Sequence, residues 1–280
     1  MPNGRVNRLG SGYAGLGIVR ELLAFSIALT WCHCGEVVMI HTRLFAFAAI
    51  VLACSIGGTT TSFPTEKPDP LSDGSCYGDQ PASYGGYIYG WPSKLDQVFW
   101  PHTEPEFIWF CPDSGFTAFL GDLELDPTER ERALAYLADH YRPSEEGPSL
   151  KDKLRLLEDL YDLRDKDNRF RNWLLRALAH IYETHLDEVA TANEYRMKAL
   201  EQIETALNDK LEPKIKFEYL FLAARHSLLF DSQADAVLYQ QELATAAPAA
   251  DDDEVRAYGE YLLETLEEYK SQDTQNDEVE

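Results

Sequence analysis

A long stretch with the hydrophobic period of helices, from about residue 126 to residue 270, constrains the fold of this 280-residue chain most strongly. The stretch opens at Asp126-Pro127-Thr128-Glu129, where aspartate can cap a helix, proline fits its first turn and glutamate completes a capping box. The period is clearest over 168–185, where apolar side chains recur on one helix face. We predict seven helices, over 127–141, 150–163, 168–185, 188–208, 213–230, 232–246 and 252–270.

Short polar breaks between the predicted helices, such as 183–187, indicate antiparallel neighbours. This paired layout resembles the tetratricopeptide solenoids, whose repeats recur about every 34 residues. Here Trp173 and Phe217, which open two successive pairs, are 44 residues apart, so the region is repeat-like without the family's spacing. The polar, acidic tail over 271–280 is expected to be disordered.

The segment 76–125 has a different character, because 12 of the 43 residues from Tyr77 to Phe119 are aromatic and glycine and proline interrupt them often. Short strands and turns are typical of this composition, and Tyr87-Ile-Tyr89 and Phe107-Ile-Trp-Phe-Cys111 are the candidate strands. We therefore predict an α+β fold, mostly α, in which a small β-rich segment precedes an antiparallel helical region.

The run that begins at Met39 has the layout expected at the start of an exported protein. A short basic region ends at Arg43, ten apolar residues follow, and the run Val51-Leu52-Ala53-Cys54 closes it, which is the layout of an export signal. The ending resembles the lipobox of bacterial lipoproteins, with leucine at a position where that residue is tolerated. The resemblance implies a signal peptide over 39–53, lipid attachment at Cys54 and, from Ser55, retention at the outer membrane.

Residues 1–38 have two interpretations besides an over-extended gene start, namely a long atypical leader or a short membrane hairpin. Their apolar run over 22–31 is shorter than the roughly 20 residues that a spanning helix needs. Cys32-His-Cys34 supplies too few ligands for a structural zinc site. Residues 54–75 are rich in Thr, Ser, Gly and Pro, which predicts a flexible tether.

Only Cys76 and Cys111 remain beyond Cys54, and two cysteines in an oxidising compartment suggest one disulfide. The bridge would close a loop of 35 residues and stabilise the fold by about 3 kcal/mol. The alternative is two unpaired thiols in an aromatic core.

The chain has 48 acidic and 25 basic residues, and 38 of the acidic residues follow Gly121. Binding to a phosphate backbone needs a basic face, and the sequence contains no cluster of Lys and Arg. We therefore do not expect nucleic acid as a partner. An acidic, self-repelling surface is the ordinary consequence of this balance. The run at 251–254 lacks the spaced ligands of a calcium loop and is explained by negative charge at a helix start.

The run from Trp109 to Asp122 resembles a segment of an uncharacterised bacterial family, the domain of unknown function 2225. That resemblance covers roughly residues 75–247 and implies a zinc-ribbon-like segment followed by tetratricopeptide-like helices. Ser114 stands where the second metal-binding cysteine belongs, and a further Cys-x-x-Cys pair is missing, so a tetrahedral thiolate site cannot be assembled. The residues that match the family pattern are Cys111, Pro112, Gly115, Ala118 and Asp122.

Aromatic residues with polar tips make effective contacts, which gives a candidate recognition surface for a sugar or a peptide. Its members are Tyr84, Tyr87, Tyr89, Trp91, Trp100 and Trp109. The alternative is that a segment of about 45 residues needs these rings for its core. A mixed metal site from Cys76, His102, Cys111, Asp113 and His140 is a further hypothesis, as is a cysteine nucleophile with His102 or His140 as its base.

We expect an exported, lipid-anchored envelope protein that acts in protein interaction without catalysis, and we assign it no catalytic residue, cofactor or metal. Its expected partners are the membrane, through the lipid, and a protein or peptide. The alternatives are a cytosolic zinc-ribbon-like protein, if Cys54 carries no lipid, and an enzyme acting on envelope glycan or peptidoglycan. The enzyme would use paired carboxylates from among Asp96, Glu104, Glu106 and Asp113.

Overall fold

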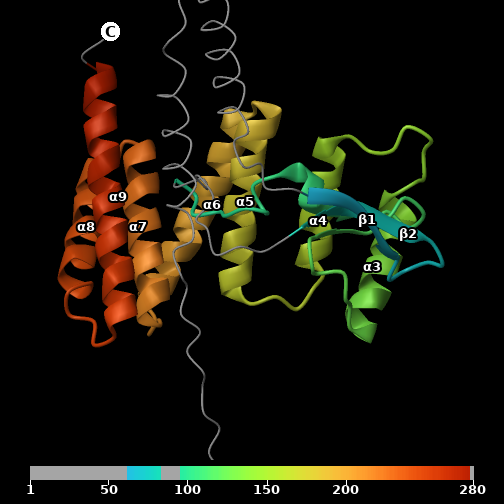
Figure 1. Ribbon diagram of the computed structural model, residues 1–280, viewed down its shortest axis with the longest axis horizontal. Coiled ribbons are helices and arrows are strands. Elements are labelled where there is room, and N and C mark those ends of the chain that lie inside the picture. The colour runs from blue at the N-terminus through green and yellow to red at the C-terminus, as the bar shows by residue number, and fades with distance from the viewer. Residues whose placement is uncertain (1–61, 83–94, 278–280) are drawn as a thin grey trace, which may run out of the picture. The chain divides into compact units, whose positions relative to one another are not determined.

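The computed structural model describes residues 62–82 and 95–277, with side chains described as far as residue 269. These residues belong to one compact unit, Thr60–Glu280. The described part contains a four-stranded antiparallel sheet followed by seven α-helices (Figure 1), which confirms the predicted α+β, mostly α fold class. The predicted leader, the signal segment with Cys54, and the candidate strand at 87–89 lie outside the described residues.

The sheet has the strand order β1-β2-β3-β4. β1 (Ser62–Pro68) pairs along its whole length with β2 (Ser75–Pro81). The 3-10 helix η1 (Pro105–Phe107) leads into β3 (Ile108–Phe110), which pairs with β2 at Tyr77 and with β4 (Thr117–Phe119). The strand predicted at 107–111 is thus confirmed, one residue shorter at each end.

β1 corrects the expectation that the whole of 54–75 is a flexible tether. Its residues, Ser-Phe-Pro-Thr-Glu-Lys-Pro, have the composition of a linker and no apolar alternation. The strand forms because it lies at the edge of the sheet, where proline is tolerated, and because its backbone pairs with β2. Composition alone does not reveal a strand of this kind.

The seven helices begin and end within one residue of the predicted bounds, except at the end of α9. There the helix continues through 271–277, a segment expected to be disordered, because no proline or glycine interrupts it. The bounds are α3 (Pro127–His140), α4 (Leu150–Asp162), α5 (Asn168–Leu186), α6 (Val189–Leu207), α7 (Pro213–Leu229), α8 (Gln233–Ala246) and α9 (Asp253–Asp277).

The helix starts follow from local capping chemistry. Asp126 accepts hydrogen bonds from the backbone N–H groups of Thr128 and Glu129, and Glu129 in turn accepts one from the backbone of Asp126, which confirms the capping box. The Asp167 carboxylate likewise accepts from the backbone N–H of Phe170 at the start of α5, at 2.7 Å. Asp187 ends α5 in the left-handed conformation, with φ of 56°.

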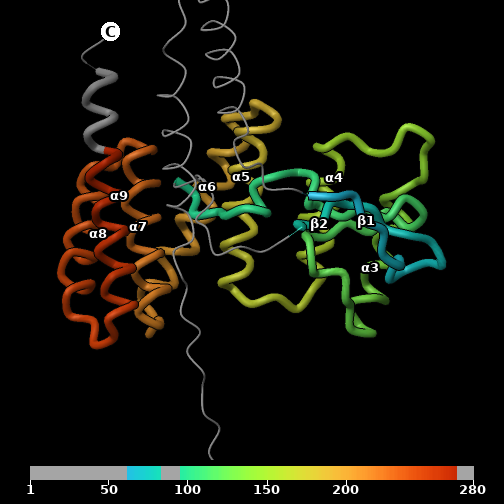
Figure 2. The backbone as a smooth tube through the Cα atoms, in the orientation of Figure 1, coloured from blue at the N-terminus to red at the C-terminus, as the bar shows by residue number. Residues whose placement is uncertain are grey.

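The helices pack as successive pairs, α5 with α6 and α7 with α8, while α9 lies against α7 and α8 (Figure 2). Ala177, Ala192 and Ala199 are fully buried between α5 and α6, and these small side chains let the helices approach closely. This arrangement is a helical repeat-like region, as the sequence predicts. The sheet has its own core, in which α3 and α4 contribute side chains beside Trp109 and Phe116.

Cys76 and Cys111 form the predicted disulfide, with their sulfur atoms 1.90 Å apart and both residues fully buried. They are brought together because β2 and β3 pair at Tyr77 and Phe110, the residues next to them. The bridge lies in the same cluster as Leu71, so it closes the core of the sheet.

A buried acidic side chain connects the stretch before η1 to three helices. Asp96 is fully buried, and Arg196 of α6 donates to both of its carboxylate oxygens, at 2.9 and 2.8 Å. Nε2 of His226 on α7 lies 3.4 Å from Asp96 Oδ1. Arg176 of α5 donates to the Asp96 backbone carbonyl at 2.7 Å.

The pair of Asp96 and Arg196 in this cluster is ionised. Burial alone would raise the pKa of the Asp96 carboxyl, but Arg196 and His226 outweigh this and hold the pKa well below its usual range. Burial lowers the pKa of His226, and the neighbouring Asp96 opposes that only in part, so the imidazole is neutral near pH 7. The cluster therefore holds an ionised aspartate against a buried guanidinium in the interior of the protein.

Removing the disulfide should destabilise the protein by about 3 kcal/mol, since the bridge restricts a loop of 35 residues in the unfolded chain. The double substitution Cys76→Ala, Cys111→Ala tests this by urea denaturation. Reduction should bring the wild type to the stability of the variant and leave the variant unchanged. Equal stability of the oxidised wild type and the variant would contradict the expectation.

Asp96→Ala should lower the free energy of unfolding by about 3 kcal/mol, because it leaves Arg196 buried without its main counter-ion. Asp139→Asn, at an exposed aspartate of α3, is the control and should be close to neutral. The folded pKa of Asp96 is depressed, so its contribution is complete above about pH 4 and is lost as the pH falls further. Urea denaturation between pH 3 and pH 7 measures both quantities, and a loss below about 1 kcal/mol at neutral pH would refute a central role for the ion pair.

Candidate functional site

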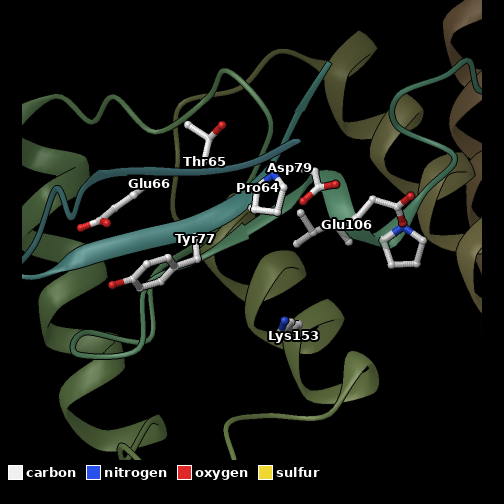
Figure 3. Close-up of a pocket in the computed structure, with 10 residues that line it drawn as sticks. Pro64, Thr65, Glu66, Tyr77, Asp79, Glu106 and Lys153 are labelled. Atoms are coloured by element: carbon white, nitrogen blue, oxygen red, sulfur yellow. The ribbon is translucent and has the colours of Figure 1, made fainter. Parts of the chain in front are cut away.

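A hollow of about 460 Å³ lies on the face of the sheet that carries Tyr77, beside η1 and α4 (Figure 3). Strand alternation builds it. Tyr77 and Asp79 are two residues apart in β2 and share a face, and their partners across the pair are Glu66 and Pro64 of β1. Its lining residues are Pro64, Thr65, Glu66, Tyr77, Gly78, Asp79, Pro105, Glu106, Ile108 and Lys153.

Tyr77 is the aromatic side chain in the lining of this sheet hollow. Its side chain is 52% exposed, whereas Cys76 beside it points to the core and is fully buried. Figure 3 shows the tyrosine ring along β2, with Glu66 toward one end of the hollow and the carboxylates of Asp79 and Glu106 toward the other. The hollow therefore offers an amphipathic ring with acidic groups around it.

The carboxylates differ in how firmly they are held. Asp79 accepts a hydrogen bond from Ser62 at 2.8 Å, and Glu66 accepts one from the hydroxyl of Ser75. Among the described residues, no hydrogen bond or ion pair engages the Glu106 carboxylate, so it is available to a bound partner.

Lys153 of α4 supplies the cation of the hollow. Its ammonium lies 5.4 Å from the centre of the buried Phe110 ring, which is the cross-strand neighbour of Tyr77. Burial lowers the pKa of Lys153. The arrangement can bind a polar or cationic group beside an aromatic face.

The four carboxylates considered for glycan hydrolysis have different surroundings in the structure. Asp96 is sealed in the interior, and Glu104 lies 3.6 Å from Nε2 of His185. Glu106 alone of the four lines the sheet hollow, and Asp113 is exposed after β3. The predicted pairing of these acids in one cleft is therefore not favoured.

Trp109 corrects the predicted recognition surface, because its side chain is only 1% exposed and packs with the disulfide in the core. A short segment needs such rings for its own packing. Trp100 is half-buried, with its ring edge to face against Phe107 at 5.3 Å. The other predicted members, Tyr84, Tyr87, Tyr89 and Trp91, lie outside the described residues.

The mixed metal site is not assembled either. Both sulfurs are in the disulfide, and His102 packs edge to face on Phe119 and Trp173. His140 stacks on Tyr136 at 4.0 Å. A carboxylate oxygen of Asp69 lies within 4.8 Å of both sulfurs, and this carboxylate accepts hydrogen bonds from the backbone of Leu71 and the hydroxyl of Ser72.

The motif from Trp109 to Asp122 serves the fold. Gly115 has φ of +81°, and a Cβ there would lie 2.3 Å from Cγ of Tyr141. Asp122 pairs with Arg164 and Lys166, at 2.8 Å each. The residues that carry the family resemblance thus shape a turn and bind the sheet to the first helices.

Of the residues that line the sheet hollow, Glu106 alone is a candidate from the sequence, and the others were not predicted. Glu66 lies in the presumed tether, and Lys153 lies in a helix 76 positions after Tyr77, its neighbour in the hollow. A weak signal was present in the alternation of Cys76, Tyr77 and Asp79, since a buried cysteine in a strand places the next residue on the opposite face.

No helix of the described part is long and apolar enough to cross a membrane. Comparison of the chain with protein-family models, with curated proteins and with solved structures gives no match.

Proposed function

We propose that this protein is an exported bacterial lipoprotein, anchored through lipid on Cys54, whose folded part acts in protein interaction at the cell envelope without catalysis. The anchor is supported by the lipobox-like run ending at Cys54. The buried Cys76–Cys111 disulfide supports it independently, because such bridges persist in oxidising compartments. Ser55 favours the outer membrane.

The sheet hollow is the observation that carries the interaction proposal. It presents an exposed tyrosine, an unengaged carboxylate at Glu106 and a half-buried ammonium at Lys153. Tyrosine contributes much contact area at a low entropic cost, and surrounding charges select the partner. The chemistry suits a protein segment that carries a basic side chain, which the acidic groups attract and the Tyr77 ring contacts.

The lipid anchor predicts a specific mass. The protein from a bacterial membrane fraction should begin at an acylated Cys54 and gain two hydrogens on reduction. Cys54→Ser should abolish acylation and release the protein from the membrane, whereas Cys32→Ser, before the predicted cleavage point, should change neither. Intact-mass and N-terminal peptide spectrometry decide the matter, and an unmodified chain that starts at Met1 or Met39 would refute the anchor.

The interaction proposal predicts site-specific cross-linking in cells. A photoreactive phenylalanine in place of Tyr77 should give a discrete cross-linked protein band, and Glu106→Lys in the same chain should strongly reduce it by reversing a charge of the hollow. The control probe replaces Leu238 of α8, which is 62% exposed and lies outside the hollow. The same bands from both positions, or none from position 77, would count against the sheet hollow as the contact site.

A further inference from the structure

A second hollow, of about 450 Å³, lies in the helical region and is separate in its lining from the sheet hollow. This volume is within the range of roughly 300–1,000 Å³ that small-molecule sites occupy. The stretch 97–99, the first turns of α5 and one residue of α7 contribute to it. Its lining residues are Gln97, Phe99, Asp167, Arg169, Phe170, Trp173, Arg176 and Glu218.

The polar part of this aromatic hollow is fixed in place. The Arg176 side chain is 2% exposed, and its Nη2 donates to Glu218 Oε1 at 2.8 Å. Asn172 accepts from Arg176 Nε at 3.1 Å, so the guanidinium has little freedom to turn. Glu218 is 20% exposed, and within the described part its second oxygen, Oε2, has no hydrogen-bond partner. A rigid acceptor is thus left at the hollow.

Three aromatic rings form the apolar part. Phe99 is 46% exposed, an unusual position for a large apolar side chain. Phe170 and Trp173 are half-buried, with ring centres 5.5 Å apart. The rings of His102 and Phe119 also pack against Trp173, each with its centre 5.0 Å from that of the indole, and these contacts restrict the indole.

The lining of the hollow contains two basic residues, Arg169 and Arg176, and two acidic residues, Asp167 and Glu218. Arg176 pairs with Glu218, and both Asp167 and Arg169 are exposed. A hollow with two cations and two anions gives no net attraction to an ionic ligand. The guanidinium groups can instead donate hydrogen bonds to hydroxyl groups of a ligand, and the carboxylates can accept hydrogen bonds from them, because a hydroxyl group is both a donor and an acceptor.

We propose that the aromatic hollow binds a neutral saccharide ring. The apolar C–H face of the ring packs on Trp173 and Phe99, and its hydroxyls meet Arg169, Asp167 and the free oxygen of Glu218. This assignment is independent of the lipid anchor and of the sheet hollow, and it adds a ligand class to the interaction function proposed above.

The full folded chain is titrated by calorimetry and by saturation-transfer NMR with N-acetylglucosamine trimer, cellotriose and maltotriose. The tripeptide Gly-Trp-Gly is the competing probe for an aromatic side chain. We expect saturable binding of at least one saccharide in the millimolar range or tighter and weaker binding of the peptide. No saturation by any saccharide, or preferential binding of the peptide, would overturn the proposal.

Two variants locate the site. Phe99→Ala should weaken saccharide binding about tenfold through the loss of one stacking ring, and Arg169→Ala should weaken it through the loss of a hydrogen-bond donor. Both side chains are exposed, so folding should be retained, which circular dichroism checks. Tyr77→Ala is the matched control, because it removes an exposed aromatic ring from the sheet hollow alone. An equal loss in Tyr77→Ala and Phe99→Ala would overturn the assignment to this hollow, and cross-linking at position 77 does not depend on the result.

Discussion

The carboxylate of Asp96 is the point at which the stretch before the sheet's third strand is held against the helices. The carboxylate pairs with Arg196 of α6 and lies close to His226 of α7. Arg176 of α5 donates a hydrogen bond to the backbone carbonyl of Asp96. An ion pair in the interior repays its desolvation only when its geometry is good and its remaining groups are satisfied. Here Arg196 also pairs with Glu183, and Arg176 with Glu218. The cluster thus fixes the positions of α5, α6 and α7 relative to the stretch 95–98.

The sheet needs a second constraint because its strands are short. β3 and β4 have three residues each, which is the lower end of the usual range of strand lengths. The disulfide closes one end of the core, and α3 and α4 cover it with side chains such as Leu137 and Leu156. The phenolic oxygen of Tyr161 accepts a hydrogen bond from the backbone of Phe119 and so joins α4 to β4.

How much of this could be read from the sequence depends on the range of the interaction. Helix bounds were predictable because caps such as Asp126 and Asp167 act within three residues. The disulfide was predictable because few cysteines were available. The edge strand β1 was not, since only pairing with β2 makes it a strand. Asp96 is 80 residues from Arg176 and 100 from Arg196, and local patterns hold no information about pairs so distant.

The two hollows lie where local pattern and tertiary structure disagree. Tyr77 and Phe99 are large rings that a pattern-based analysis would place in the core, yet both are about half exposed. Trp109, which has the same character in the sequence, is buried. The local sequence pattern usually agrees with the tertiary structure at positions that serve only folding, and disagreements concentrate at functional positions. Neither Tyr77 nor Phe99 belongs to the buried clusters of the described part, so core packing does not require these two rings, and the contacts proposed above are the role that we assign to them.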